Sequence, residues 1–236
     1  MAVSIDKVYQ KVLAISNKEQ RGYITPQEFN LLADRAQTIV FDALFSAWHN
    51  TYETTGPQGR MQDQFDMLEE RMAVHRGVQF IPPISQGTQY HTIFDSTYRL
   101  LGIHVTVSGT KSVVTEVDAK EIVYMCEHPL LAPTQERMVF VRRSPTEIQI
   151  YPYNTTNSFD ADIIQQPTKP EWGYVIVNGQ ALYNPNTTVD FDMHPADEDK
   201  LIHEILKLAG VILREPQMAQ AATALEQRDD AINQQL

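Results

Sequence analysis

The spacing of apolar residues changes twice along this chain, from helical to alternating and back to helical. Near the amino terminus, Ile5, Val8, Val12 and Ile15 recur every three or four residues, which indicates one apolar face of a helix. The string Thr25-Pro26-Gln27-Glu28 predicts the start of a second helix. Threonine followed by glutamate three residues later can form a capping box, and proline suits the first helical position. We expect that helix to end near Tyr52, with a shorter helix after it.

The middle of the chain is predicted to be rich in β-strands. Apolar and polar residues alternate strictly over 146–151, as in a strand with one face toward solvent. Residues 143–146 are predicted to form a hairpin loop, and Asn178-Gly179 is the usual signal for a tight hairpin. The predicted strands are Tyr98–Val107, Glu121–Cys126, Met138–Arg142, Glu147–Tyr151, Trp172–Val177 and Ala181–Tyr183.

The carboxy-terminal part returns to helical spacing. His194-Pro195 followed by the acidic run 197–199 predicts a helix start, because acids favour the positive end of the helix dipole. Residues 201–208 carry its buried side, and Gly210 is expected to end it. From Pro216 onward we predict a thinly apolar helix that cannot bury much surface alone. It is therefore expected to lie against a neighbouring protein or to fray.

The charge balance excludes some classes of function. The 236 residues include 19 Lys and Arg against 30 Asp and Glu, for a formal net charge of -11. A surface that binds duplex DNA needs clustered cations, so nucleic acid is a poor primary ligand. The one basic spot, Arg142-Arg143 with Arg137 nearby, is predicted to be a solvated face. No secretory signal is expected, and no apolar run approaches the roughly 20 residues that would span a bilayer.

One loop has the spacing of a calcium site. Residues 17–28, aligned with an EF-hand loop, place Gly22 at the sixth position and Glu28 at the twelfth. The fifth position normally supplies an oxygen ligand, but here it is Arg21, whose charge would repel the metal. The loop is therefore predicted to be a helix–turn–helix corner, with calcium binding as the alternative.

No catalytic, cofactor-binding or metal-binding residues are predicted. His203-Glu204 matches half of a zinc-protease motif, but Lys207 stands where the second histidine would be. Asp190 and Asp192, with the acidic run 197–199, are attributed to the start of a helix rather than to an ion site. The single cysteine, Cys126, excludes an internal disulfide and is predicted to be a small buried hydrophobe. The protein is predicted not to be an enzyme.

Several segments carry a family resemblance. They are Ile5–Leu13, Asn17–Asn30, Pro167–Tyr174, Val189–Pro195, and the helix 201–210 with the Gln-rich tail that follows it. Together they resemble virion structural proteins of tailed bacteriophages, of the kind found in marine podoviruses and crAss-like phages. The resemblance does not cover residues 60 to about 113, and it brings no catalytic or ligand residues with it.

The zones predict an α+β fold. N-terminal and C-terminal helices pack together, with a central antiparallel β-rich insertion between them. Residues 1–76 and 194–236 are expected to form a helical connector core with a C-terminal tail, and residues 77–193 a β-rich domain.

The resemblance implies a head-to-tail connector protein, an adaptor or neck ring beneath the portal. Such proteins form a homo-oligomeric ring of roughly a dozen copies. Each copy binds the next through a heterologous interface, and the repeated contact closes the ring. The implied partners are the portal and further neck or tail proteins, with DNA passing through without sequence-specific binding and no membrane contact. The implied location is the virion, after synthesis in the cytoplasm of the bacterial host. The alternative is a tail hub, a tube-associated protein or a minor cargo protein of the particle.

Overall fold

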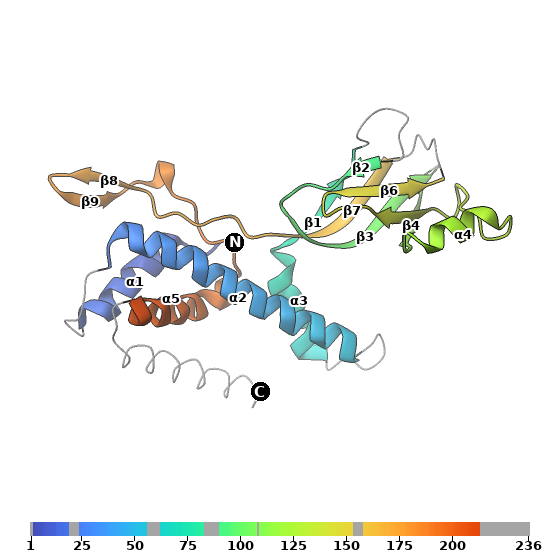
Figure 1. Cartoon of the computed structure of the whole chain (residues 1–236). Helices are drawn as coiled ribbons and strands as arrows, with labels where there is room; N and C mark the ends of the chain where they lie inside the picture. Colours follow the sequence, from blue (N-terminus) through green and yellow to red (C-terminus); the bar gives the residue numbers. More distant parts are fainter. Residues whose placement is uncertain are drawn as a thin grey trace. The chain divides into compact units, whose positions relative to one another are not determined.

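The computed structural model describes residues 2–18, 24–55, 62–82, 90–107, 109–152 and 158–212. It confirms an α+β fold, with helices at the two ends of the chain and strands between them (Figure 1). The chain forms two compact units: unit 1 comprises Met1–Val74 and Pro167–Leu236, and unit 2 comprises His75–Gln166. Residues 167–193, which the sequence groups with the β-rich domain, cluster with the helices of unit 1.

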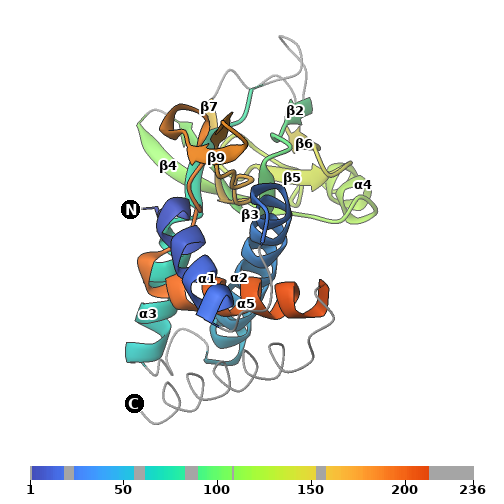
Figure 2. The same ribbon diagram turned by 90° about the vertical axis from the view of Figure 1, so that its left-hand side faces the viewer.

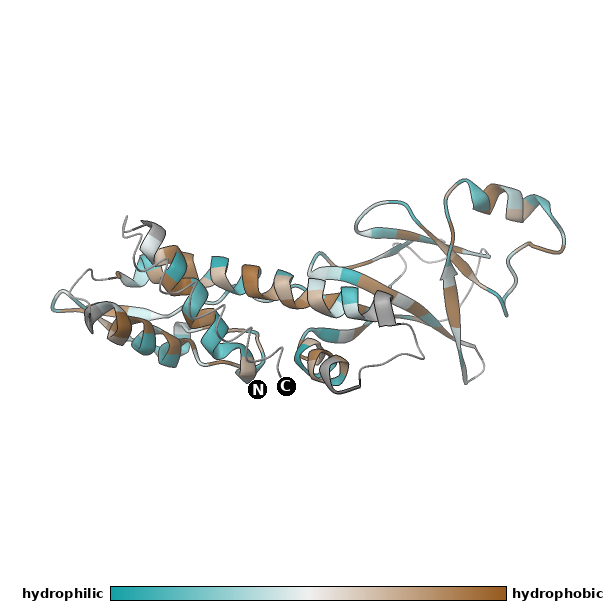
Figure 3. Ribbon diagram, turned by 90° about the horizontal axis from the view of Figure 1, so that it is seen from below, coloured by the Kyte–Doolittle hydropathy of each residue, from teal (hydrophilic) through white to brown (hydrophobic). Residues whose placement is uncertain are grey.

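The described part of unit 1 contains four α-helices. They are α1 (Ile5–Lys18), α2 (Pro26–Thr55), α3 (Gln62–Ala73) and α5 (Glu198–Ile212). Helix α2 packs against α3 and α5, and α1 packs against α5, as Figure 2 also shows. Hydrophobic and hydrophilic positions both occur along α2 (Figure 3), and its apolar side buries Phe29, Ala36 and Phe41. The helical periodicity at both ends of the chain is therefore confirmed.

The capping box predicted at the start of α2 is present. The backbone N–H and the hydroxyl of Thr25 both donate to Glu28 Oε2, at 2.9 and 2.8 Å, and Thr25 Oγ1 accepts from the Glu28 N–H at 3.3 Å. The backbone and hydroxyl donors of Thr25 lower the pKa of the Glu28 carboxyl from its usual 4.5.

Helix α5 begins where the sequence predicts but ends later. His194 Nδ1 accepts the Ala196 N–H at 3.2 Å, and a short 3-10 turn, Pro195–Asp197, leads into the helix. The prediction that Gly210 ends the helix is wrong, because α5 continues to Ile212. Glycine costs a helix interior only about 1 kcal/mol, so a single glycine does not by itself end a helix.

Unit 2 is a seven-stranded mixed sheet with the order β1-β7-β3-β4-β5-β6-β2. The strands are β1 (Arg76–Phe80), β2 (Tyr90–Thr92), β3 (Thr97–Val107), β4 (Thr110–Glu116), β5 (Val139–Arg142), β6 (Glu147–Tyr151) and β7 (Ser158–Gln165). All neighbours are antiparallel except β4 and β5, which run parallel. Exposure alternates along β1, but Ile148, Gln149 and Ile150 of β6 are all buried, so the solvent-facing side predicted for residues 146–151 is wrong.

The sheet of unit 2 curls until its two outer strands approach each other. Just after β1, the Pro82 carbonyl accepts the N–H of Thr92 in β2 at 3.2 Å. The enclosed core draws side chains from every strand region, including Ile81, Ile103 and Phe140. The hairpin predicted around residues 143–146 is confirmed by the pairing of β5 with β6.

Residues Glu121–Cys126, predicted as a strand, belong instead to a short helix, α4 (Glu121–Glu127). Because β4 and β5 are parallel neighbours, the chain between them must cross back along the sheet, and α4 lies in that crossover. In α4 Ile122 is buried against Val139 and Val141. Cys126 is exposed, so its predicted burial is also wrong.

A separate two-stranded hairpin belongs to unit 1. It consists of β8 (Tyr174–Val177) and β9 (Gln180–Tyr183), joined by Asn178 and Gly179. The φ angles of Asn178 and Gly179 are 51° and 79°, both in the left-handed region that a tight two-residue hairpin requires. This hairpin prediction is confirmed.

None of the helices in the described part of the chain combines the length and apolarity needed to cross a membrane.

Candidate assembly surface

Residues 167–193, here called the strap, run from unit 2 back to helix α5 and carry the β8–β9 hairpin, here called the arm. In Figures 1 and 2 the arm lies to one side of helices α1 and α2. The strap has two limbs, one before the arm and one after it. The buried side chain of Gln37 in α2 forms hydrogen bonds with both limbs. Its Nε2 donates to the Thr168 carbonyl at 2.7 Å, and its Oε1 accepts the Asp192 N–H at 3.1 Å.

The two limbs of the strap also pair with each other and with the amino terminus. Glu171 and Val189 exchange backbone hydrogen bonds of 3.0 and 2.8 Å. Val3 and Phe191 exchange two more, of 3.2 and 3.1 Å. Because the base of the arm is bonded on both limbs, the arm projects from a fixed platform rather than from a loose loop.

Trp172 is the main anchor at the base of the arm. Its ring is 4% exposed, lies 4.4 Å from the Tyr9 ring of α1, and donates its Nε1–H to Asp6 Oδ1 at 3.0 Å. The side chain of Asn30 in α2 accepts the Trp172 N–H at 2.8 Å and donates to its carbonyl at 3.3 Å. One residue of the strap is thus bonded to both α1 and α2.

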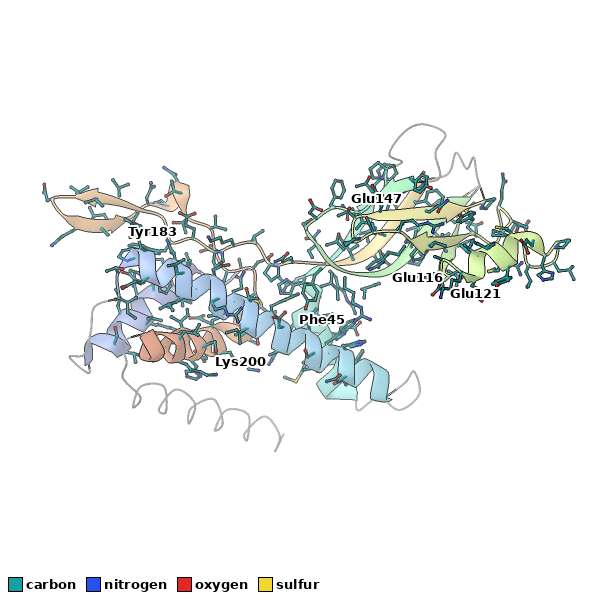
Figure 4. The ribbon with its side chains drawn as sticks, in the orientation of Figure 1. Phe45, Glu116, Glu121, Glu147, Tyr183 and Lys200 are labelled. Atoms are coloured by element: carbon teal, nitrogen blue, oxygen red, sulfur yellow. The ribbon has the colours of Figure 1, made fainter. Side chains whose placement is uncertain are left out.

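The next residue, Gly173, has no room for a side chain. A Cβ there would lie 2.2 Å from Thr187 Oγ1 and 2.8 Å from the Asn184 carbonyl oxygen. Beyond it, the rings of Tyr174 and Tyr183 lie 5.8 and 5.9 Å from the Trp172 ring. Figure 4 labels Tyr183 on β9. The aromatic contacts therefore extend from the helices to Tyr174 and Tyr183, which form the first cross-strand pair of the arm.

Beyond that first pair, the arm is apolar and exposed. Residues 174–183 contain no Asp, Glu, Lys or Arg, in a chain whose net charge is -11. The exposed large apolar side chains of the arm are Val175, Ile176, Val177, Leu182 and Tyr183. They offer on the order of 500 Å² of accessible surface, within the range of the functional patches of monomeric proteins. An isolated two-stranded ribbon is only marginally stable in water. The exposed apolar surface of the arm is therefore of the kind that a binding partner covers.

Two of the acidic residues that the sequence singles out, Asp190 and Glu198, have bonding partners on helix α1. Asp190 Oδ1 accepts the Ile5 N–H at 3.0 Å. Glu198 pairs with Lys11 at 2.6 Å, and this hydrogen bond raises the pKa of the Lys11 ammonium from its usual 10.5. Within the described ranges, no group of three or more His, Cys, Asp or Glu side chains is placed to hold a metal ion.

The half-matched zinc motif and the loop with EF-hand spacing both contain residues with structural roles. Glu204, in the half-matched zinc motif, pairs with Lys207 at 3.1 Å. In the loop with EF-hand spacing, Thr25 and Glu28 serve the capping box, while residues 19–23 lie outside the described residues. The terminal helix predicted from Pro216 also lies outside them.

The basic spot is an exposed face, as predicted. Arg143 Nε donates to Gln149 Oε1 at 2.6 Å, Arg137 Nη2 donates to the Leu130 carbonyl at 3.1 Å, and all three arginines are exposed.

A pocket of about 190 Å³ lies between α2, α3 and α5. At its wall Arg71 Nη1 lies 3.4 Å from Asp197 Oδ1, and the Asp197 side chain is 2% exposed. Asp197 Oδ2 is buried without a hydrogen-bond partner among the described residues. Ligand pockets begin at about 300 Å³. We therefore interpret this space as a packing gap beside a buried ion pair rather than as a cofactor site.

Sequence reasoning located the arm but missed its exposure and its anchors. The sequence indicates Trp172 as the first residue of a strand and as part of the resembling segment Pro167–Tyr174, and it gives Gln37 no distinct role. The signal for Gln37 was a polar residue on the apolar side of α2, next to the buried Ala36. The signal for the arm was a hairpin with apolar residues on both faces and no charge.

No protein-family model matches this chain, and the search of curated proteins gave no match.

Proposed function

We propose that the protein is a structural component of a bacteriophage particle that assembles as a ring at the head-to-tail connector, beneath the portal and around the DNA channel. The observation that carries the proposal is the anchored arm: an uncharged apolar hairpin held by Trp172 and Gln37 and exposed from Val175 to Leu182. A rigid platform that presents apolar surface serves association rather than catalysis.

The arm supports a heterologous contact between copies. Each copy would insert its arm into the next copy, and a repeated contact of this kind closes into a ring when the rotation per copy divides a full turn. The helices of unit 1 supply a rigid scaffold for that contact, because α2 packs on both α3 and α5. Copy number is then set by the angle between arm and acceptor.

The acidic balance fits a channel through which DNA slides. DNA is held electrostatically when protein cations neutralise its phosphates and release their counterions. A chain with a net charge of -11 has no excess of cations for this, so DNA that passes through the channel is not retained. The partners in this proposal are further copies of the chain, the portal, and neighbouring neck or tail proteins.

The test is a cryo-EM reconstruction of the neck in purified particles of the phage that encodes the chain. A closed ring of this chain against the portal, with the arm buried between copies, is the expected result. Absence of the chain from mature particles would overturn the structural role.

The alternative within the particle is a tail hub, a tube-associated protein or a minor cargo protein. The observation that favours it is the curled sheet of unit 2, whose outer strands are joined by the bond from Thr92 to Pro82. Density for the chain only along the tail, in the same reconstruction, would select this alternative.

A further inference from the structure

Strand β1 is an outer strand of the unit 2 sheet, and the bond from Thr92 to the Pro82 carbonyl meets its outer edge only beyond its last residue, Phe80. Ile81 donates its N–H to the Phe159 carbonyl on β7, at 2.9 Å, and the sheet register places Gln79 opposite Ala161. In an antiparallel pair the backbone groups of alternate residues point to opposite sides. Val78 and Phe80 therefore direct their N–H and C=O groups away from β7, and among the described residues nothing bonds them.

The side chains on this edge are apolar and exposed. Val78 is 70% exposed and Phe80 is 55% exposed. Most proteins protect such an edge with charges, a bulge or a covering segment, because an open edge is a template for another strand. The other outer strand, β2, is only three residues long and is already bonded to Pro82 by Thr92.

The arm has the same kind of edge. The tight turn makes Val177 and Gln180 a hydrogen-bonded pair, and the Asn184 N–H donates to the Gly173 carbonyl at 2.8 Å. By alternation, Ile176 directs its backbone groups away from β9 and toward the open edge of β8. Its side chain is 69% exposed.

We infer that the arm of one copy adds strand β8 to the open edge of strand β1 in the next copy, extending that copy's sheet by two strands. This inference rests on the proposed function and names the acceptor surface for the arm. Strand addition of this kind gains affinity from main-chain hydrogen bonds and specificity from alternate side chains, here Ile176 against Val78 and Phe80.

The uncharged arm and the area of the contact are the two features that fit a second copy as the occupant. Two copies that each carry -11 repel each other, and contact through the uncharged arm brings no further acidic group to the interface. The edge strand β1 carries one charge, that of Arg76. The apolar side chains of the arm offer on the order of 500 Å², and Val78, Phe80 and the newly paired backbone of the acceptor bring the contact toward about 1,000 Å², the lower limit for a specific interface.

The experiment is cross-linking between two full-length single-cysteine proteins. Cys126, the one native thiol and an exposed one, is first replaced by Ser. One protein then carries Ile176→Cys and the other Val78→Cys, and the two are mixed with a short bismaleimide. The control acceptor is Val123→Cys, because Val123 is 56% exposed on helix α4, which has no strand edge to offer.

The expected result is a cross-linked heterodimer with Val78→Cys in about tenfold greater yield than with Val123→Cys. Adding Phe80→Lys to the acceptor is expected to abolish this excess, because a charge on an edge strand opposes pairing. Equal yields from the two acceptors would overturn the inference, as would cross-linking confined to a single chain that carries both cysteines. The ring role itself is decided separately, by the presence or absence of the chain in the particle neck.

Discussion

Replacing Trp172 with alanine removes the side chain that joins the base of the arm to helix α1. The ring is 4% exposed, packs at 4.4 Å from the Tyr9 ring, and donates to Asp6 Oδ1 at 3.0 Å. Truncating a buried tryptophan to alanine typically costs about 3–5 kcal/mol. Since a domain is stable by only about 5–15 kcal/mol, unit 1 should lose at least about a fifth of its stability.

The measurement is urea unfolding followed by far-ultraviolet circular dichroism, which reports mainly on unit 1 because most of the described helix lies there. Trp172→Phe keeps an aromatic ring but loses the donor to Asp6, so it is expected to cost about 1–2 kcal/mol. Tyr124→Ala, on the exposed side of α4, is the matched control and should change stability by less than about 0.5 kcal/mol.

A loss below about 1 kcal/mol for Trp172→Ala would refute the anchoring argument. It would mean that the strap is held by its backbone pairs and by the side chains of Gln37 and Asn30. An equal loss for Trp172→Phe and Trp172→Ala would show instead that the hydrogen bond to Asp6, not the ring packing, carries the effect.

Three further changes test other parts of the structure. Gly173→Ala should destabilise unit 1 by about 1–3 kcal/mol, because its Cβ would meet Thr187 Oγ1 at 2.2 Å; an unchanged urea midpoint would contradict the close packing. Thr25→Ala should cost about 1 kcal/mol through loss of the helix cap, whereas Thr25→Ser, which keeps the hydroxyl, should be near neutral in the same titration. Burial lowers the pKa of His91 from its usual 6.5, so the unfolded chain binds the proton more readily and stability should fall as the pH drops below about 6.5. His91→Gln should weaken this pH dependence of the free energy of unfolding; an identical dependence in the variant would assign it to other groups.

Sequence reasoning succeeded where a few adjacent residues decide the structure. The Thr25–Glu28 box closes within one helical turn. Asn178 and Gly179 tolerate the positive φ angles that the hairpin turn needs. In both cases the stabilising interaction lies within a few residues, so the local string contains all the information required.

Sequence reasoning failed where a short apolar run fits two structures. Residues 122–126 are typical of a buried strand, yet they form part of α4. Periodicity cannot separate strand from helix over so few residues. The choice was made by the parallel pairing of β4 with β5, which no local pattern encodes.

The sequence by itself determined the α+β class, the helical ends, the position of the arm and its lack of charge. Tertiary structure alone decided that the arm stays exposed, that Gln37 ties both limbs of the strap, and that β1 is an outer strand with an open edge. The physical reason is the range of the interactions. Helix caps and tight turns involve near neighbours, whereas Gln37 bonds residues more than a hundred positions away, and the order of strands in a sheet depends on the whole chain.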